Sequence, residues 1–244
     1  MSPAPRGPPG KEIATATQEL AQYFTPPAVA AFAFDALEAL GLDGGPHRVV
    51  DPACGEGVFL RVARERFPDA ELWGCDVDPG LAPAWQRAGL RDGLTHLLVL
   101  DGLGDSPLFG LQAGSFSLVV GNPPYGLGLA RPASGEPIEA QFVRRFVQLV
   151  RPGGWLAVVV PEGIVANARC QALRDWVLER LALEAVVALP ETTFASSRTR
   201  AHTVLLIARR ERPSRQPVLL ASPADAAASL GDYLRDVLAT IRSR

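Results

Sequence analysis

Short runs of Val, Leu, Ile and Ala alternate along the chain with stretches that repeat apolar residues at helical spacing. Seven of the runs have the length and composition of strands, over residues 47–51, 70–78, 95–101, 116–123, 153–162, 183–191 and 201–210. Helical patterns occupy residues 58–67, 80–89, 138–151 and 167–181. This alternation predicts an α/β fold with a mostly parallel sheet and helices on both faces. Such sheets bind ligands at the carboxyl ends of their strands, so the functional residues are expected there.

The two ends of the chain depart from this pattern. Residues 1–17 begin "MSPAPRGPPGKE" and are expected to form a flexible, Pro-rich N-terminus that is not a signal peptide. Residues 211–244 hold one short apolar run and a helix candidate over 224–242, too little for a second domain of ordinary size. The expected organisation is one domain over residues 18–210, followed by a C-terminal extension with a short strand and a helix.

Composition narrows the class of protein. Hydrophobic residues make up 48% of the chain, which indicates a packed core, and no apolar run approaches the ~20 residues needed to cross a bilayer. The three cysteines, Cys54, Cys75 and Cys170, show no CxxC spacing and argue against a disulfide framework or a structural zinc site. The expectation is a reduced, cytoplasmic protein with no metal and no membrane partner.

The balance of charge bears on nucleic-acid binding. The chain has 24 basic and 26 acidic residues and a net charge of −2. A domain that grips DNA alone usually shows a basic excess, because phosphate contacts supply most of the affinity. A nucleic-acid substrate would therefore have to be held by a local arginine patch or by a partner.

Three successive predicted strands end in an aspartate. Asp51 opens "DPACGEGVFL", in which Gly55 and Gly57 let the backbone approach a ligand at the start of the next helix. Asp76 in "GCDVDP" is placed to accept hydrogen bonds from the two hydroxyls of a ribose. Asp101 could accept one from an adenine amino group. Together the three aspartates predict an adenosine-bearing ligand laid across the strand ends.

The fourth predicted strand runs into "GNPPYG", residues 121–126. Two consecutive prolines donate no backbone hydrogen bonds, so strand pairing must stop there. Asn122 offers a side-chain carbonyl and Pro123 a backbone carbonyl, two acceptors that can converge on one amino group. Tyr125 could lie against the face of a planar ring, where stacking is worth ~1–3 kcal/mol. The motif predicts a holder for a planar amine, which would act as the nucleophile.

These motifs occur in an order that resembles one enzyme family. In sequence they are "AQYFTPPAVAAF" (21–32), "DPACGEGVFL" (51–60), "GCDVDP" (74–79), "LDG" (100–102), "GNPPYG" (121–126) and "LPETTF" (189–194). Over residues 18–210 the chain resembles the amino-type, N6-adenine DNA methyltransferases whose cofactor motifs come first, including type I modification subunits and TaqI-like enzymes. The resemblance implies a Rossmann-like, S-adenosylmethionine-dependent methyltransferase fold with seven strands, the last one antiparallel.

The resemblance also implies a role for individual residues. The methionine end of the cofactor would be covered by Tyr23, Thr25 and Pro26, and its amino acid moiety approached by Asp51, Ala53, Cys54 and Gly55. Asp76 would hold the ribose and Asp101 the adenine. The target base would be held by Asn122, which also borders the cofactor, with Pro123, Pro124 and Tyr125, and Phe194 would pack on its other side. Phe194 is nearly as well explained as an ordinary core aromatic.

The implied substrate is an adenine flipped out of duplex DNA, as in a restriction-modification or related defence system. Two departures from the family pattern stand out. Glu56 replaces the usual Ser of "DPACGSG", and no target-recognition domain follows the core, so a separate specificity subunit is a possible partner. Two other functions stay open. One is methylation of a protein glutamine or an RNA base, and the other is a non-catalytic, methyltransferase-like scaffold.

Overall fold

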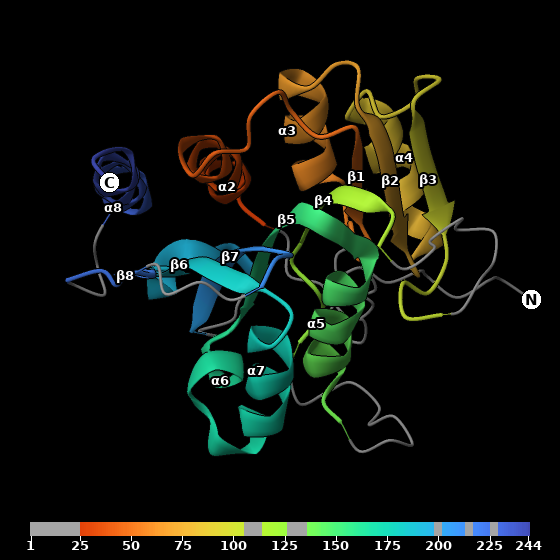
Figure 1. Cartoon of the computed structure of the whole chain (residues 1–244). Coiled ribbons are helices and arrows are strands. Elements are labelled where there is room, and N and C mark those ends of the chain that lie inside the picture. Colours follow the sequence, from red (N-terminus) through yellow and green to blue (C-terminus); the bar gives the residue numbers. More distant parts are fainter. Residues whose placement is uncertain (1–24, 105–113, 126–135, 198–201, 213–216, 225–228) are drawn as a thin grey trace, which may run out of the picture.

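The computed structural model describes residues 25–104, 114–125, 136–197, 202–212, 217–224 and 229–244. Within these residues one sheet of eight strands forms the centre of the molecule, in the order β3-β2-β1-β4-β5-β7-β6-β8 (Figure 1). The strands are β1 (Arg48–Asp51), β2 (Glu71–Asp76), β3 (Thr95–Val99), β4 (Phe116–Gly121), β5 (Val150–Pro161), β6 (Ala182–Ala188), β7 (Thr203–Arg209) and β8 (Leu219–Ala221). All neighbours are parallel except β7, which is antiparallel to both β5 and β6.

Helices cover both faces of the sheet, as the sequence predicts (Figure 1). One face carries α2 (Pro27–Ala39), α3 (Val58–Arg66), α4 (Ala82–Arg87) and α8 (Leu230–Arg242). The other carries α5 (Ile138–Leu149), α6 (Glu162–Ala166) and α7 (Gln171–Leu178). Short 3-10 turns occupy Pro79–Leu81, Ala168–Cys170 and Glu191–Ser197.

The central strands feed two separate hydrophobic cores, one under each helical layer. Leu118 and Val120 of β4 point into the core beneath α2, α3 and α8, whereas Val119 between them points into the core beneath α5 and α7. This alternation follows from the two-residue period of a strand. A strand buried on both faces therefore appears in the sequence as a continuous apolar run.

All seven predicted strands are present, and the antiparallel one is the last of them, β7. The predicted count of seven is wrong by one, because β8 adds a strand at the edge of the sheet beside β6. β8 is the short strand expected in the C-terminal extension, but the sequence did not show that it joins the main sheet. The stretch predicted as one helix over 167–181 is a 3-10 turn, Ala168–Cys170, followed by α7; Asn167 caps the turn by accepting a hydrogen bond from the backbone N–H of Arg169.

Helix α2 was not predicted from the sequence and begins with Pro27 at its first position, where the missing N–H costs nothing. Among the helices that the structure describes, none is long and apolar enough to span a membrane.

Candidate functional site

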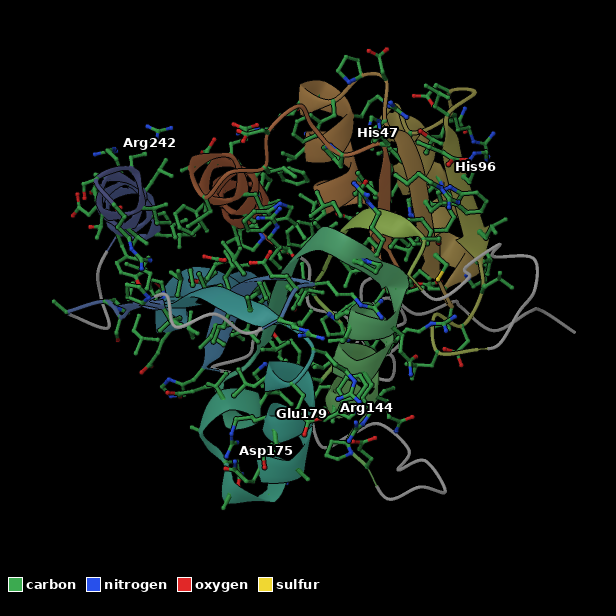
Figure 2. The ribbon with its side chains drawn as sticks, viewed as in Figure 1. His47, His96, Arg144, Asp175, Glu179 and Arg242 are labelled. Atoms are coloured by element: carbon green, nitrogen blue, oxygen red, sulfur yellow. The ribbon has the colours of Figure 1, made fainter. Side chains whose placement is uncertain are left out.

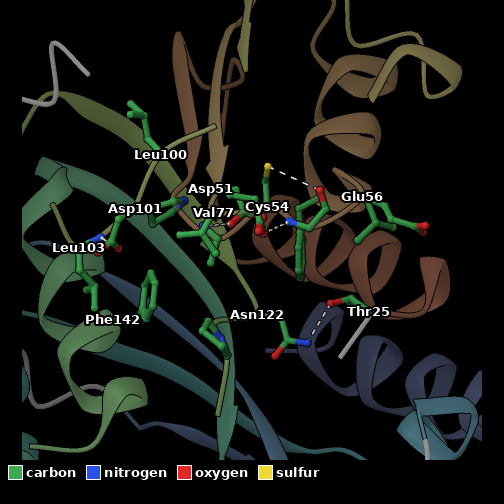
Figure 3. Close-up of a pocket in the computed structure, with 18 of the residues that line it drawn as sticks. Thr25, Asp51, Cys54, Glu56, Val77, Leu100, Asp101, Leu103, Asn122 and Phe142 are labelled. Atoms are coloured by element: carbon green, nitrogen blue, oxygen red, sulfur yellow. Dashed lines mark hydrogen bonds between the residues drawn. The ribbon is translucent and has the colours of Figure 1, made fainter. Parts of the chain in front are cut away.

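A cavity of about 230 Å³ opens at the carboxyl ends of β1, β2 and β4 (Figure 3). Its position is the one expected for a ligand site in a parallel sheet. It is lined by Thr25, Asp51, Pro52, Ala53, Cys54, Gly55, Glu56, Val58, Phe59, Asp76, Val77, Leu100, Asp101, Gly102, Leu103, Asn122, Pro124, Ile138 and Phe142.

The turn between β1 and α3 forms the floor of this cavity and is bonded to β2. The N–H of Cys54 donates to the carbonyl of Cys75 at 2.8 Å, and the N–H of Gly55 donates to Asp76 Oδ2 at 2.9 Å. Gly57 ends the turn with φ of 83°, a left-handed conformation that favours glycine. These bonds hold the backbone of residues 52–57 against the ends of two strands.

Asp51 is the most deeply buried acid of the site, with 1% of its surface exposed. Burial raises the pKa of Asp51 to about 8, the Asp76 carboxylate adds to the rise, and the N–H of Ala53, which donates to Asp51 Oδ1 at 3.1 Å, opposes it. A positive charge brought next to Asp51 would favour its ionised form. The site is therefore built to gain from a cationic ligand.

Asp76 lies at the end of β2 and lines the same cavity. Its Oδ1 accepts from the N–H of Asp78 at 3.1 Å and its Oδ2 from Gly55, while burial raises its pKa. With Asp51, Glu56 and Asp101, four carboxyl groups line the cavity, and its described lining residues include no Lys, Arg or His. The charge of the site is thus of one sign.

Asp101 follows β3 and is exposed, with its Oδ1 accepting from the N–H of Leu103 at 2.9 Å. The neighbouring Gly102 packs so closely that a Cβ there would lie 1.8 Å from the carbonyl oxygen of Pro52. Arg145 of α5 donates to the carbonyls of Gly102 and Gly104, each at 3.1 Å. These contacts fix the third strand end relative to the first.

Asn122 follows β4 and reaches the other end of the cavity (Figure 3). Its Nδ2 donates to Thr25 Oγ1 at 3.1 Å, a contact between residues 97 positions apart. In this arrangement the amide nitrogen of Asn122 points toward Thr25 and its carbonyl oxygen points away from Thr25 (Figure 3). Thr25 in turn is held two residues before α2, which packs on the core of the sheet.

The other sequence-predicted residues have mixed positions. Ala53, Cys54, Gly55 and Pro124 line the cavity. Pro26 lines a neighbouring groove that shares Thr25 with the cavity. Pro123 and Tyr125 are buried beside Asn122, with Tyr125 3% exposed, and neither lines the cavity.

Phe194 is not brought to the cavity. It is 1% exposed and belongs to the hydrophobic core beneath α2, α3 and α8, which favours its interpretation as a core aromatic. Its stacking role stays a prediction that would require the ring to leave this core. Tyr23 lies outside the residues that the structure describes.

Sequence reasoning missed the apolar wall of the cavity. Val77, Leu100 and Leu103 come from the segments after β2 and β3, while Ile138 and Phe142 come from the first turns of α5. Figure 3 shows Phe142 and Leu103 beside Asp101, at the end of the cavity away from Glu56 and Thr25. The cavity therefore has an apolar end suited to a flat ring and a polar end at Glu56 and Thr25.

His47 and His96, which are labelled in Figure 2, do not line this cavity. His47 precedes β1 and His96 is the second residue of β3, so both are at the amino ends of the strands. His96 stacks on Trp73 with ring centroids 4.3 Å apart, and its Nε2 lies 3.4 Å from Glu71 Oε1. These contacts indicate that His96 has a structural role, at the edge of the sheet opposite the cavity.

Comparison with known proteins shows which family this chain matches. The family model described as N-6 DNA Methylase matches residues 101–229. The type II methyltransferase M.TthHB8I of Thermus thermophilus is 29% identical over 180 residues, which are 63% of this chain and 37% of that enzyme. The rRNA N(6)-adenosine-methyltransferase metl-5 of Caenorhabditis elegans is 30% identical over 141 residues, covering 56% of this chain and 61% of that protein.

The fold is similar to that of a solved methyltransferase subunit. The type I restriction-modification system methyltransferase subunit of Streptococcus thermophilus superposes with a TM-score of 0.71 at 18% identity. The match covers 93% of this chain and 55% of that subunit. This chain thus spans a little over half of that subunit and 37% of the Thermus enzyme.

Proposed function

The chain belongs to the N-6 DNA Methylase family, and on that premise we propose that it transfers a methyl group from S-adenosylmethionine to the exocyclic N6 of adenine in DNA. The observation that carries the proposal is the position of Asn122. Its amide, oriented by Thr25, borders the same cavity as the strand-end carboxyl groups of Asp51 and Asp76. A holder for a planar amine and a site for a cationic adenosine ligand therefore share one wall.

The residues of the cavity fit S-adenosylmethionine. This cofactor carries a sulfonium and an ammonium group, which match a cavity with four carboxyl groups and no basic side chain among its described lining residues. Its adenine suits the apolar end formed by Val77, Leu103 and Phe142, and its ribose hydroxyls can donate to Asp76. Thr25, Pro26, Ala53, Cys54 and Gly55 would hold the methionine moiety, as the family resemblance implies.

The chain's own residues would act mainly by positioning. The bound cofactor supplies an electrophilic methyl group on a sulfonium sulfur. Asn122 Oδ1 and the backbone carbonyl of Pro123 would each accept a hydrogen bond from the target amino group, which favours a more pyramidal, more nucleophilic nitrogen. The target nitrogen would take this methyl group as its bond to sulfur breaks, and one amino proton would be lost to solvent. Holding two reactants in such an orientation contributes up to ~7–11 kcal/mol.

Pro124 would keep this strand end rigid, since its fixed φ restricts the backbone between the holder and Tyr125. Tyr125 would contact one face of a base flipped out of the duplex. Similarity to a type II methyltransferase and to a type I methyltransferase subunit supports a role in restriction-modification. The net charge of −2 supports a separate specificity subunit, because the chain lacks the basic excess that phosphate contacts require.

A second candidate is methylation of adenine in RNA. It is favoured by one observation, the 30% identity to an rRNA N(6)-adenosine-methyltransferase over 56% of this chain. The same cavity and the same Asn122 would serve both acceptors, since each presents the identical amino group. The two functions differ in what holds the polymer outside the cavity.

One experiment tests both candidates. The purified chain is incubated with S-adenosylmethionine labelled in its methyl group and with unmethylated genomic DNA or ribosomal RNA, and the digested nucleosides are identified. We expect labelled N6-methyldeoxyadenosine. If labelled N6-methyladenosine is found in the RNA and no label is found in the DNA, RNA is the substrate and the DNA proposal is wrong.

The matched control is Asn122→Ala. We expect it to lower transfer by about 100-fold or more, the loss typical when a reacting group is misplaced. Its affinity for the cofactor, measured by calorimetry, should stay close to that of the wild type. A variant that mainly lost cofactor affinity would contradict the role given to Asn122.

A further inference from the structure

A second, larger groove adjoins the cavity and carries the opposite charge. It measures about 620 Å³ and is lined by Thr25, Pro26, Pro27, Glu56, Val58, Arg61, Ala84, Arg87 and Ala88. Thr25, Glu56 and Val58 line both spaces, so the groove meets the cavity at its polar end. Figure 3 shows Glu56 and Thr25 at that end, away from Phe142 and Asp101.

The two arginines of the groove have no structural partner among the described residues. Of the three arginines on α3, Arg64 binds Asp92 and Arg66 binds Asp35 and Glu38. Arg61 on the same helix takes part in none of the side-chain hydrogen bonds or ion pairs found within the described ranges, and neither does Arg87 of α4. Two guanidinium groups thus line one groove, and neither is hydrogen-bonded or ion-paired to another described side chain.

We infer that Arg61 and Arg87 form an anion subsite that takes the carboxylate of the cofactor's methionine moiety. The inference rests on the proposed function, and it follows from the signs of the charges. An amino acid end carries an ammonium and a carboxylate. The charged side chains that line the cavity are all carboxyl groups, which can pair with the ammonium but not with the carboxylate. Across the shared boundary, the groove is lined by the guanidinium groups of Arg61 and Arg87.

The geometry of α3 favours Arg61 as the main contact. Side chains on a helix lean toward its N-terminus, so Arg61 leans toward the turn of Glu56 and Gly57 that forms the boundary. A guanidinium can hold a carboxylate through two parallel hydrogen bonds. Glu56, which differs from the usual Ser of the family motif, would then hold the ammonium group between the two spaces.

The test compares two ligands that differ only in the carboxylate. Calorimetry measures the dissociation constants of S-adenosylmethionine and of decarboxylated S-adenosylmethionine for the wild type and for Arg61→Met, which keeps the length of the side chain but not its charge. We expect Arg61→Met to weaken S-adenosylmethionine binding by about tenfold or more, as for a charge-assisted hydrogen bond. Binding of the decarboxylated ligand should stay unchanged.

Two further variants complete the design. Arg87→Met should act in the same direction and more weakly, because Arg87 is more exposed. Arg91 is an exposed arginine that lines neither the cavity nor the groove. Arg91→Met should therefore leave the dissociation constants of both ligands unchanged.

The inference is overturned if Arg61→Met weakens both ligands equally or neither. It is also overturned if the substitution lowers affinity for a duplex DNA probe while cofactor binding is unchanged, since the groove would then serve a phosphate. Wild-type protein that binds neither ligand would instead refute the proposed function itself, and the inference with it.

Discussion

The hydrogen bond between Asn122 and Thr25 joins the proposed amine holder to the wall of the cofactor cavity. A side-chain amide has a donor and an acceptor end, and a half-turn of the amide would present its NH₂ to the target amino group, which repels it. We expect Thr25→Val, which keeps the volume but removes the hydroxyl, to lower kcat by about tenfold. Steady-state methyl transfer measures this effect, and Thr25→Ser should restore activity.

A double variant separates orientation from packing. In the Asn122→Asp background both ends of the side chain are oxygen, so the orientation no longer matters. Thr25→Val should then cause little further loss. Equal losses from Thr25→Val in the two backgrounds would show that Thr25 acts through packing alone.

Asp51 makes the site sensitive to pH. Its folded-state pKa of about 8 lies above the ordinary 3.8, so its contribution to stability is complete below pH 3.8 and is lost as pH rises through 8. A cationic cofactor favours the ionised form, so its binding should release a proton and tighten as pH rises toward 8. Calorimetry at pH 7 in buffers of different ionisation enthalpy measures that release.

Asp51→Asn provides the control for this titration. It keeps an oxygen that can accept from the N–H of Ala53 but has no proton to lose. We expect the proton release to disappear and the free variant to be more stable than the wild type above pH 8, by about 1 kcal/mol or more. A proton release that persisted in Asp51→Asn would have to come from another group.

The sequence identified the residues that follow strands more readily than those that come from helices. Asp51, Asp76, Asp101 and Asn122 are polar groups at the ends of apolar runs, and the structure brings all four to one cavity. Phe142 was missed because α5 also buries apolar residues in the core, and the sequence does not show which one faces a ligand. The acceptor groups of Asn122 and Pro123 and the aromatic ring after them could be inferred from the sequence. The contact of Asn122 with Thr25, 97 positions away, could not.

The loop after β3 packs against the loop after β1. Gly102 touches the backbone of Pro52, and a Cβ would lie 1.8 Å from the Pro52 carbonyl oxygen. We expect Gly102→Ala to push the ends of β1 and β3 apart, lowering the free energy of unfolding by about 1–3 kcal/mol and weakening cofactor binding. Urea unfolding and calorimetry measure the two effects.

Gly93→Ala is the matched control, because nothing lies within 4 Å of a Cβ at that position. It should leave cofactor affinity unchanged. If Gly102→Ala bound the cofactor as tightly as Gly93→Ala does, the register between the two strand ends would not matter for the site.

The elements themselves were largely predictable where their pattern was local. Strands buried on both faces, such as β4, appear as apolar runs that only a parallel sheet covered on both faces accommodates. The short strand β8 was expected in the C-terminal extension, but its pairing with β6 is a contact that no local pattern encodes. Helix α2 was hidden by the two prolines that precede and begin it.

At the scale of the whole molecule, the C-terminal helix α8 packs against α2, the helix that follows the site residue Thr25. Leu234, Val237 and Ile241 of α8 are buried in the same core as α2, and the two helices lie side by side (Figure 1). Helix α2 begins two residues after Thr25, and β8 extends the sheet beside β6. The position of Thr25, and through it that of Asn122, therefore depends on residues far along the chain.

This dependence can be tested by removing residues 211–244. Burying one large aliphatic side chain is worth ~1.5–3 kcal/mol, so losing three should lower the free energy of unfolding by about 4 kcal/mol or more. Urea unfolding measures the loss, and Leu234→Ala in the full chain should fall between the shortened variant and the wild type. Because α2 would lose its neighbour, we also expect kcat to fall at saturating cofactor. A shortened variant with unchanged stability and kcat would show that residues 18–210 form a self-sufficient catalytic domain, as the sequence pattern alone predicts.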